Sequence, residues 1–442
     1  MFFENRQLNT LWDSCLRRND GLRPTFHSCA TGSRNDGDTA LVVSKLKSRS
    51  LILPLLFLLV LYSCKTAKLA TTQTSVVDPI IVPLDTLIQK PLYITQKGDT
   101  LPSLDLEVDI AIKRLLPDTI SIAAVGDIMM GTNYPNKSYL PADNGKFLWN
   151  ESREILKNAD ITFGNLEGTI LDGEGDPKEC NNPKACYLFR MPTSITSNLV
   201  DCGFDLMSVA NNHANDFGTV GRISTQKTLD SLGIVTAGSI ENPYTITKIN
   251  GMRIGFVAFA PNKGTLGFYD TARAIAIIKE LELESDMVIV SIHGGAEGAA
   301  NQHLTRKREF YFGEDRGNIY EFSHLMIDNG ADVIIGHGPH VSRAIEVYKK
   351  RIISYSLGNF CTYGRFNLTG ANAVAPILIS KVSASGEFLT GEIISFKQTY
   401  ADGPKFDPTL TASRTISKLS QEDFPENEIF VDEKGRIIYL HN

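Results

Sequence analysis

The feature that most constrains the fold is a polar motif placed directly after a short apolar segment, which the chain repeats five times. The apolar segments are rich in β-branched residues, as in buried strands of a parallel sheet, and functional groups gather on the loops where such strands end. The sequence therefore predicts five strand ends that converge on one site. The motifs are residues 126–131 (GDIMMG), 164–168 (GNLEG), 208–218 (SVANNHANDFG), 293–297 (HGGAE) and 334–340 (IIGHGPH).

The overall charge narrows the class of ligand. The 442 residues include 44 basic and 50 acidic side chains, which gives a net charge of −6. Proteins that bind nucleic acid normally carry a basic excess or a basic stripe. We therefore expect no nucleic-acid partner, and a small or carbohydrate-like ligand is favoured.

The composition is that of a globular protein, with 42% hydrophobic and 21% charged residues, and it suffices for one domain of about 300 residues. Segments with helical spacing alternate with short apolar strands, which predicts an α/β body. Asn250-Gly251 predicts a hairpin turn, and a β-rich part follows the body. We expect helices at 147–157, 193–202, 219–232, 271–284 and 319–329, and later strands at 344–348, 351–356, 377–382 and 392–396.

The N-terminal region predicts an extracytoplasmic protein. Lys45, Lys47 and Arg49 precede an apolar run at 51–61, which is shorter than the roughly 20 residues of a membrane span and is typical of a signal peptide. Residues 61–64 (LYSC) resemble a bacterial lipobox, in which the cysteine, here Cys64, carries the lipid. We expect a lipid-anchored protein of the bacterial cell envelope; the alternative is a plain signal anchor.

These signals divide the chain into five parts. Residues 1–41 show no apolar periodicity and are interpreted as a doubtful leader. Such a leader would result if the start codon had been assigned too far upstream. The signal peptide is expected at 42–64, and a Thr-rich tether, with a strand near 91–94, at 65–117. The folded domain is expected at 118–400 and a C-terminal tail at 401–442.

Two pairs of cysteines have different contexts. Cys180 and Cys186 flank a polar loop, and an extracytoplasmic setting permits a disulfide between them. The alternative is two free thiols. Cys202 and Cys361 lie in apolar segments and are expected to be core residues.

The side chains of the motifs have the chemistry of a metal site. Divalent ions in hydrolytic sites prefer carboxylate and imidazole ligands with an occasional amide oxygen, and two ions about 3.5–4 Å apart can activate a phosphoryl transfer. Taken singly, each histidine has a structural interpretation, and Asp127 could cap a helix. Together they predict a site for one or two ions of Mn, Mg, Fe or Zn. The expected ligands are Asp127, Glu167, Asn212, His293 and His337, with Asn212 and His213 in catalysis and His213 as general acid or phosphate ligand.

The ordered motifs, together with residues 355–360 (YSLGNF), resemble the CapA family of bacterial capsule and poly-gamma-glutamate synthesis proteins. The resemblance extends from about residue 120 to residue 396. It implies a calcineurin-like metallophosphoesterase fold, a four-layered α/β/β/α sandwich. It also implies a surface role in making or exporting an anionic polymer.

The resemblance assigns metal roles to Asp127, Asn212, His293 and His337, and the sequence departs from the phosphoesterase pattern elsewhere. Met129 stands where that pattern has a histidine, and Asn165 and Glu167 stand where it has a bridging aspartate. Two residues, instead of one, separate His337 from His340. Within the capsule family a tryptophan commonly occupies the position of Gly294, and its loss is expected to alter substrate stacking.

A second group of polar residues is expected to contact the substrate: Asn165, Glu297, His340, Arg343 and Asn359. The Asn359 amide either orients a ligand or closes a turn. Arg343 either holds an anionic substrate, because guanidinium groups suit phosphate and carboxylate, or is a solvated surface charge.

Two functions agree with these features. One is a metal-dependent hydrolase, phosphoesterase-like, that acts on a cell-envelope polymer or its lipid-linked precursor; amide-bond transfer, as in polyglutamate chain release, is a variant. The other is a non-catalytic, lipid-anchored scaffold that binds the polymer within an export machine. The expected partners are an anionic cell-surface polymer, the membrane and the proteins of polymer synthesis and export.

Overall fold

The computed structural model describes residues 117–180 and 186–440. The expected signal peptide, the lipidation site at Cys64, the tether and the strand near 91–94 lie outside these residues. Within them, no helix has both the length and the apolar character that crossing a bilayer requires.

Two large sheets form the body. The first sheet has the strand order β19-β20-β17-β16-β1-β2-β5-β6, and β15 and β18 add to it beside β1 and β17. Its strands are β1 (Thr119–Met129), β2 (Ile161–Leu166), β5 (Leu206–Ser208), β6 (Val235–Ala237), β15 (Asn359–Thr362), β16 (Val374–Ser383), β17 (Phe388–Thr399), β18 (Gly403–Phe406), β19 (Ile429–Val431) and β20 (Arg436–Tyr439).

The second sheet has the order β13-β14-β12-β9-β8-β7. Its strands are β7 (Tyr244–Ile249), β8 (Met252–Phe259), β9 (Met287–His293), β12 (Val333–His337), β13 (Ile345–Tyr348) and β14 (Arg351–Ser354). Two short pairs stand apart, β3 (Thr169–Ile170) with β4 (Arg190–Met191) and β10 (Glu309–Tyr311) with β11 (Glu314–Gly317).

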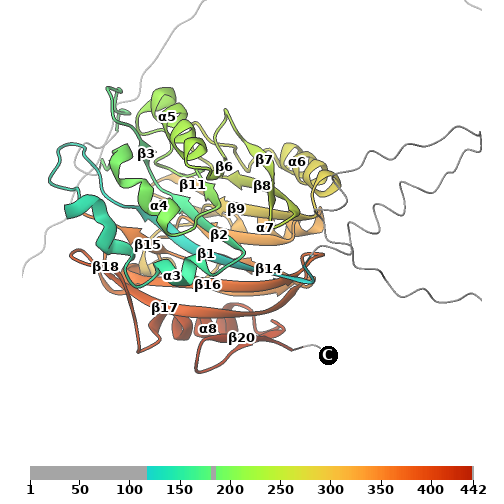
Figure 1. The fold of residues 1–442 in the computed structure, drawn as a ribbon. Helices are drawn as coiled ribbons and strands as arrows, with labels where there is room; N and C mark the ends of the chain where they lie inside the picture. Colours follow the sequence, from blue (N-terminus) through green and yellow to red (C-terminus); the bar gives the residue numbers. More distant parts are fainter. Residues whose placement is uncertain (1–116, 181–185, 441–442) are drawn as a thin grey trace, which may run out of the picture. The chain divides into compact units, whose positions relative to one another are not determined.

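Helices cover the outer faces of both sheets. One apolar core lies between the sheets, a second lies beneath α3, α4 and α5, and a third lies beneath α6 and α7. The predicted four-layered α/β/β/α fold is confirmed (Figure 1). The helices are α3 (Arg153–Lys157), α4 (Ser197–Asp201), α5 (Gly218–Ser231), α6 (Thr271–Glu284), α7 (Ile319–Asp328) and α8 (Thr411–Asp423), with 3-10 turns at Ala142–Trp149, Thr193–Ile195, Ala299–Asn301 and Gly370–Ala373.

The helices expected at 219–232, 271–284 and 319–329 form, whereas the two others are broken. The segment 193–202 divides into a 3-10 turn and α4, and the Thr196 hydroxyl donates to the Thr193 carbonyl at 2.7 Å. Thr and Ser side chains compete in this way for the backbone groups of a helix. The segment 147–157 divides likewise between a 3-10 turn and α3.

The C-terminal residues belong to the same folded body. β20 pairs with β17, and α8 packs against β16 and β17 of the first sheet and β13 of the second (Figure 1). Ala412 and Ile416 of α8 are buried in the core between the sheets. Residues 401–440 are therefore part of the folded body and do not form an independent tail. Helix α8 was not predicted from the sequence.

A close backbone approach fixes the end of β1. The Asp127 N–H donates to the Gly358 carbonyl at 2.9 Å. A Cβ atom at Gly126 would lie 1.9 Å from the same carbonyl oxygen. Only glycine therefore lets the turn before β15 pass over β1 and hold Asp127 in place.

We predict that Gly126→Ala lowers the free energy of unfolding by about 1–3 kcal/mol, because the added methyl group forces the backbone of β1 or of Gly358 to shift. Urea unfolding followed by circular dichroism measures the change. Gly267→Ala is the matched control, because nothing lies within 4 Å of a Cβ built at Gly267. Equal stability of the two variants would contradict the assigned role of Gly126.

Candidate metal centre

The predicted convergence of strand ends is present. Strands β1, β2 and β5 run parallel in the first sheet, and β9 and β12 run parallel in the second. Asp127 of β1 is in register with Asn165 of β2, and His293 of β9 is in register with His337 of β12. The two sheets thus bring the five motifs to one place.

Asp127 connects the two sheets. Its Oδ1 accepts a hydrogen bond from Asn165 Nδ2 at 2.8 Å and lies 3.5 Å from His337 Nδ1. Its Oδ2 lies 2.9 Å from His340 Nδ1. The carboxylate is fully buried, so these three neighbours replace the water that would otherwise solvate it.

Glu167 is the second buried carboxylate. It lies directly after β2, and its Oε1 is 3.5 Å from His340 Nε2 and 4.0 Å from His213 Nε2. One ligand atom from each of Asp127, Glu167 and His340 lies within 4.8 Å of the other two. His340 was expected in substrate binding, and the structure places it among the candidate metal ligands.

Several polar atoms of the centre have no hydrogen-bond partner among the described residues, although they are buried. They are both carboxylate oxygens of Glu167, His293 Nε2, both ring nitrogens of His337 and Asn212 Oδ1. Leaving such atoms unsatisfied is costly. Carboxylate, imidazole and amide oxygen groups are the donors that divalent ions accept, so the residues fit a metal ion.

The charges of the centre favour a cation between the carboxylates. Burial would raise the pKa of Asp127, but His337 and His340 outweigh burial and hold this pKa below its ordinary value. Burial raises the pKa of Glu167 well above its ordinary value. Burial also disfavours a charged imidazole, yet the charge of Glu167 and the hydrogen bond to Asp127 raise the pKa of His340 to about 10. A positive charge is thus stabilised where the two carboxylates meet.

His213 is held on one edge of the centre. Its Nδ1 lies 2.8 Å from Asp216 Oδ2, and its ring packs on Phe189 with centroids 4.2 Å apart. Burial lowers the pKa of His213 against the opposing effect of Asp216. Asp216 belongs to the motif at 208–218, three residues after His213, but no role was predicted for it.

The loop before β4 also reaches the centre. Lys178 Nζ lies 2.5 Å from Asp216 Oδ1 and donates to the Asn212 carbonyl at 3.0 Å. Cys180 and Cys186 form a disulfide in the same loop. Nothing in the sequence indicated Lys178, because its partners follow it by more than thirty residues.

The remaining residues expected at the substrate differ in their environment. Asn359 Oδ1 lies 3.1 Å from His340 Nδ1, and its Nδ2 donates to the Asn372 carbonyl at 3.1 Å, so Asn359 helps to orient His340. Glu297 pairs with Arg316 at 3.0 Å, and its other carboxylate oxygen is 3.9 Å from His340 Nε2.

Both expectations for Arg343 are wrong. The residue is only 1% exposed, so it is no surface charge. Its guanidinium donates to Glu309 at 2.7 and 3.0 Å and to the carbonyls of Ala296 and Asn301. These bonds occupy the group that a substrate would need, and Arg343 instead fixes the loop after His293.

Two departures from the family pattern have structural causes. Met129 is fully buried in the apolar core outside the first sheet. A Cβ at Gly294 would lie 2.5 Å from Ile319 Cδ1 and 2.9 Å from the Arg316 carbonyl oxygen. β11 and the start of α7 therefore occupy the space that a side chain at position 294 would need.

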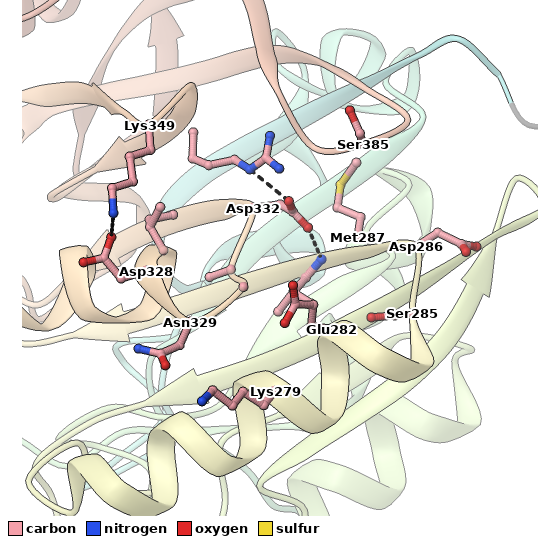
Figure 2. Close-up of a pocket in the computed structure, with 15 residues that line it drawn as sticks. Lys279, Glu282, Ser285, Asp286, Met287, Asp328, Asn329, Asp332, Lys349 and Ser385 are labelled. Atoms are coloured by element: carbon pink, nitrogen blue, oxygen red, sulfur yellow. Dashed lines mark hydrogen bonds and ion pairs between the residues drawn. The ribbon is translucent and has the colours of Figure 1, made fainter. Parts of the chain in front are cut away.

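A separate cavity of about 470 Å³ lies at the other end of the strands of the second sheet. It is lined by the first residues of β9 and by the residues that directly precede β12. Figure 2 shows Lys349 paired with Asp328, and two interactions made by Asp332. Asp332 accepts from the Val288 N–H at 2.8 Å and pairs with Arg351 at 3.0 Å, and Lys349 pairs with Asp328 at 2.6 Å. The cavity contains none of the five motifs.

Comparison with known proteins gives matches to a family, to curated relatives and to solved structures. The sequence profile of the family described as "Bacterial capsule synthesis protein PGA_cap" matches residues 121–363. The PGA biosynthesis protein CapA of Bacillus subtilis (strain 168) is 31% identical over 327 residues, which cover 70% of this chain and 80% of that protein. The capsule biosynthesis protein CapA of Bacillus anthracis is 29% identical over 255 residues, which cover 55% of this chain and 60% of that protein. Among solved structures, a putative 5'-nucleotidase from Staphylococcus aureus shares 16% identity with a TM-score of 0.35, covering 69% of this chain and 58% of that chain.

Proposed function

The chain belongs to the bacterial capsule synthesis protein family PGA_cap, and on that premise we propose that it acts in the biosynthesis or export of a capsule or poly-gamma-glutamate type polymer. Its partners in this role are the anionic polymer or its precursor and the proteins that make and export it. The chain then works at the bacterial cell envelope, anchored outside the cytoplasm by the expected lipid on Cys64.

The chemistry proposed for the centre is metal-dependent hydrolysis, of a phosphoester above all. The observation that carries this proposal is Glu167, a fully buried carboxylate with no hydrogen bond to either oxygen, beside a second buried carboxylate, Asp127. Two buried carboxylates this close are costly to ionise without a cation. Two adjacent carboxyl groups beside unsatisfied ligand atoms are suited to bind a divalent ion.

The residues of the chain have distinct tasks in such a site. Asp127, Glu167 and His340 hold the ion, which is Mn, Mg, Fe or Zn in this proposal. When bound, the ion supplies Lewis-acid stabilisation of the charge that develops on a phosphoryl group.

His213 moves the proton. Its Nδ1 is held by Asp216, so its Nε2 is directed towards Glu167 and is available as general acid or base. Lys178 holds Asp216 from the other side, and Phe189 keeps the imidazole ring in its plane.

A second candidate function is a scaffold that binds the polymer without turnover. Two observations favour it: Met129 is in the core, where it cannot be a ligand, and Asn165 directs an amide N–H group at Asp127. The measurements below distinguish the two functions.

We predict that the purified protein contains near-stoichiometric divalent metal and hydrolyses a generic phosphodiester or monoester in added manganese. The double variant Asp127→Ala, His293→Ala is expected to lose both properties, because it removes a buried ligand and a buried imidazole of the centre. Elemental analysis and ester hydrolysis measure the change, and treatment with a chelator should abolish turnover in the unmodified protein. A folded protein without metal and without turnover would leave the scaffold as the better account.

We predict that His213→Ala lowers kcat by about 10²–10⁴-fold while the metal content stays unchanged, because the variant removes the proton-transfer group and no ligand. Asp216→Asn should lower kcat in the same direction and alter the pH profile, since it removes the negative charge that stabilises a protonated His213 imidazole. His303→Ala is the matched control, because His303 forms an exposed pair with Asp423 at 2.7 Å, outside the motifs. Unchanged kcat in His213→Ala would exclude its role in catalysis.

A further inference from the structure

Asn165 lies at the point where a pair of ions would need a shared ligand. It belongs to β2, is fully buried, and is placed between Asp127 of β1 and His293 of β9. Two divalent ions about 4 Å apart repel four times as strongly as two unit charges. A carboxylate between such ions offsets this repulsion with its charge and with a lone pair for each ion. An amide has no charge, and only its oxygen has lone pairs suited to an ion.

The backbone determines which way the neighbouring amide of Asn211 points. The His213 N–H, which can only donate, lies 3.1 Å from one end of this amide, and that end must therefore be Oδ1. The Leu166 carbonyl, which can only accept, lies 2.8 Å from the other end, which must be Nδ2. The orientation of Asn211 thus follows from two backbone groups whose roles are unambiguous.

Asn211 in turn determines the orientation of Asn165. The Asn211 Nδ2 lies 3.2 Å from Asn165, so Asn165 must present Oδ1 to it. The Nδ2 of Asn165 is left facing the centre, 2.8 Å from Asp127 Oδ1 and 3.4 Å from His293 Nδ1. The two N–H groups of the Asn165 amide therefore occupy the side of Asp127 where a second ion would need lone pairs.

We propose that the centre binds a single divalent ion, on the side of Asp127 that faces Glu167 and His340, and that the inward-facing amide of Asn165 excludes a second ion. The inference rests on the proposed metal site and specifies its stoichiometry and place. The ligand atoms of Asp127, Glu167 and His340 gather within 4.8 Å of one another. The side-chain amides of Asn359 and Asn372 donate to the backbone carbonyl of His340, not to these ligand atoms.

The test is a gain of metal binding. Asn165→Asp exchanges the inward N–H group for a carboxylate oxygen of nearly the same size, while the other oxygen still accepts from Asn211. The full chain, stripped of metal and dialysed against manganese, is expected to bind one ion per molecule, and Asn165→Asp is expected to bind two. Electron paramagnetic resonance should show an isolated Mn²⁺ in the unmodified protein and a spin-coupled pair in the variant.

Asn165→Leu is the matched control. Leucine has a similar volume, and it neither donates a hydrogen bond nor bridges two ions, so this variant should stay at one ion. Thermal unfolding with and without manganese verifies that each variant is folded.

Two ions in the unmodified protein would overturn the inference and leave the proposed metal site standing, whereas no ion in any variant would overturn both. One ion in Asn165→Asp would overturn the role of Asn165.

The place of the ion is tested separately. His340→Ala is expected to weaken manganese binding about 100-fold or more, because it removes a ligand. His293→Ala is expected to weaken binding less, by about tenfold or below, because His293 lies beyond the Asn165 amide. A larger loss in His293→Ala than in His340→Ala would place the ion on the other side of Asp127 and overturn the inference.

Discussion

The structure depends on the burial of two carboxylates, Asp127 and Glu167, at the edge where the two sheets meet. A buried carboxylate is stable only with compensating charge and hydrogen bonds. His340 is the group that contacts both, at 2.9 Å from Asp127 and 3.5 Å from Glu167. The first sheet contributes the acids and the connection after β12 contributes the imidazole, so the centre also joins the two halves of the sandwich.

This requirement explains why backbone geometry around the centre is so restricted. Gly126 admits the carbonyl of Gly358, which in turn accepts from the Asp127 N–H. His340 adopts a positive φ of 57°, which is unusual for a residue with a Cβ, and the bonds from Asn359 hold it there. Backbone and amide groups that do not titrate thus help to fix the positions of Asp127 and His340, which keeps the site rigid without water.

The sequence predicted the parts of this arrangement that have a local signal. α6 forms over the residues expected, because an apolar stripe follows Asp270, whose side chain accepts from the Arg273 N–H. The five motifs converge because parallel strands end at a common edge. α8 was missed although Ala412, Ile416 and Leu419 are buried at helical spacing, since the Ser and Thr residues between them obscure the pattern. Arg343 was misjudged, because its partner Glu309 lies on β10, a strand of three residues without a periodic signal.

The departures from the phosphoesterase pattern fit together as one change in the centre. Met129 is committed to the apolar core, so the first strand offers Asp127 alone. Asn165 is turned by Asn211 so that it donates to Asp127 instead of sharing an ion with it. Without a histidine at position 129, Asp127 has one positive neighbour fewer, and Glu167 adds a second buried acid that needs a cation beside it. His340 lies one residue beyond the place where the pattern has its last histidine, and it contacts both acids from the turn that Gly338 and Pro339 lengthen after β12. In the single-ion centre that we propose, the altered spacing and the altered ligands share one physical explanation, a cation on the Glu167 side of Asp127.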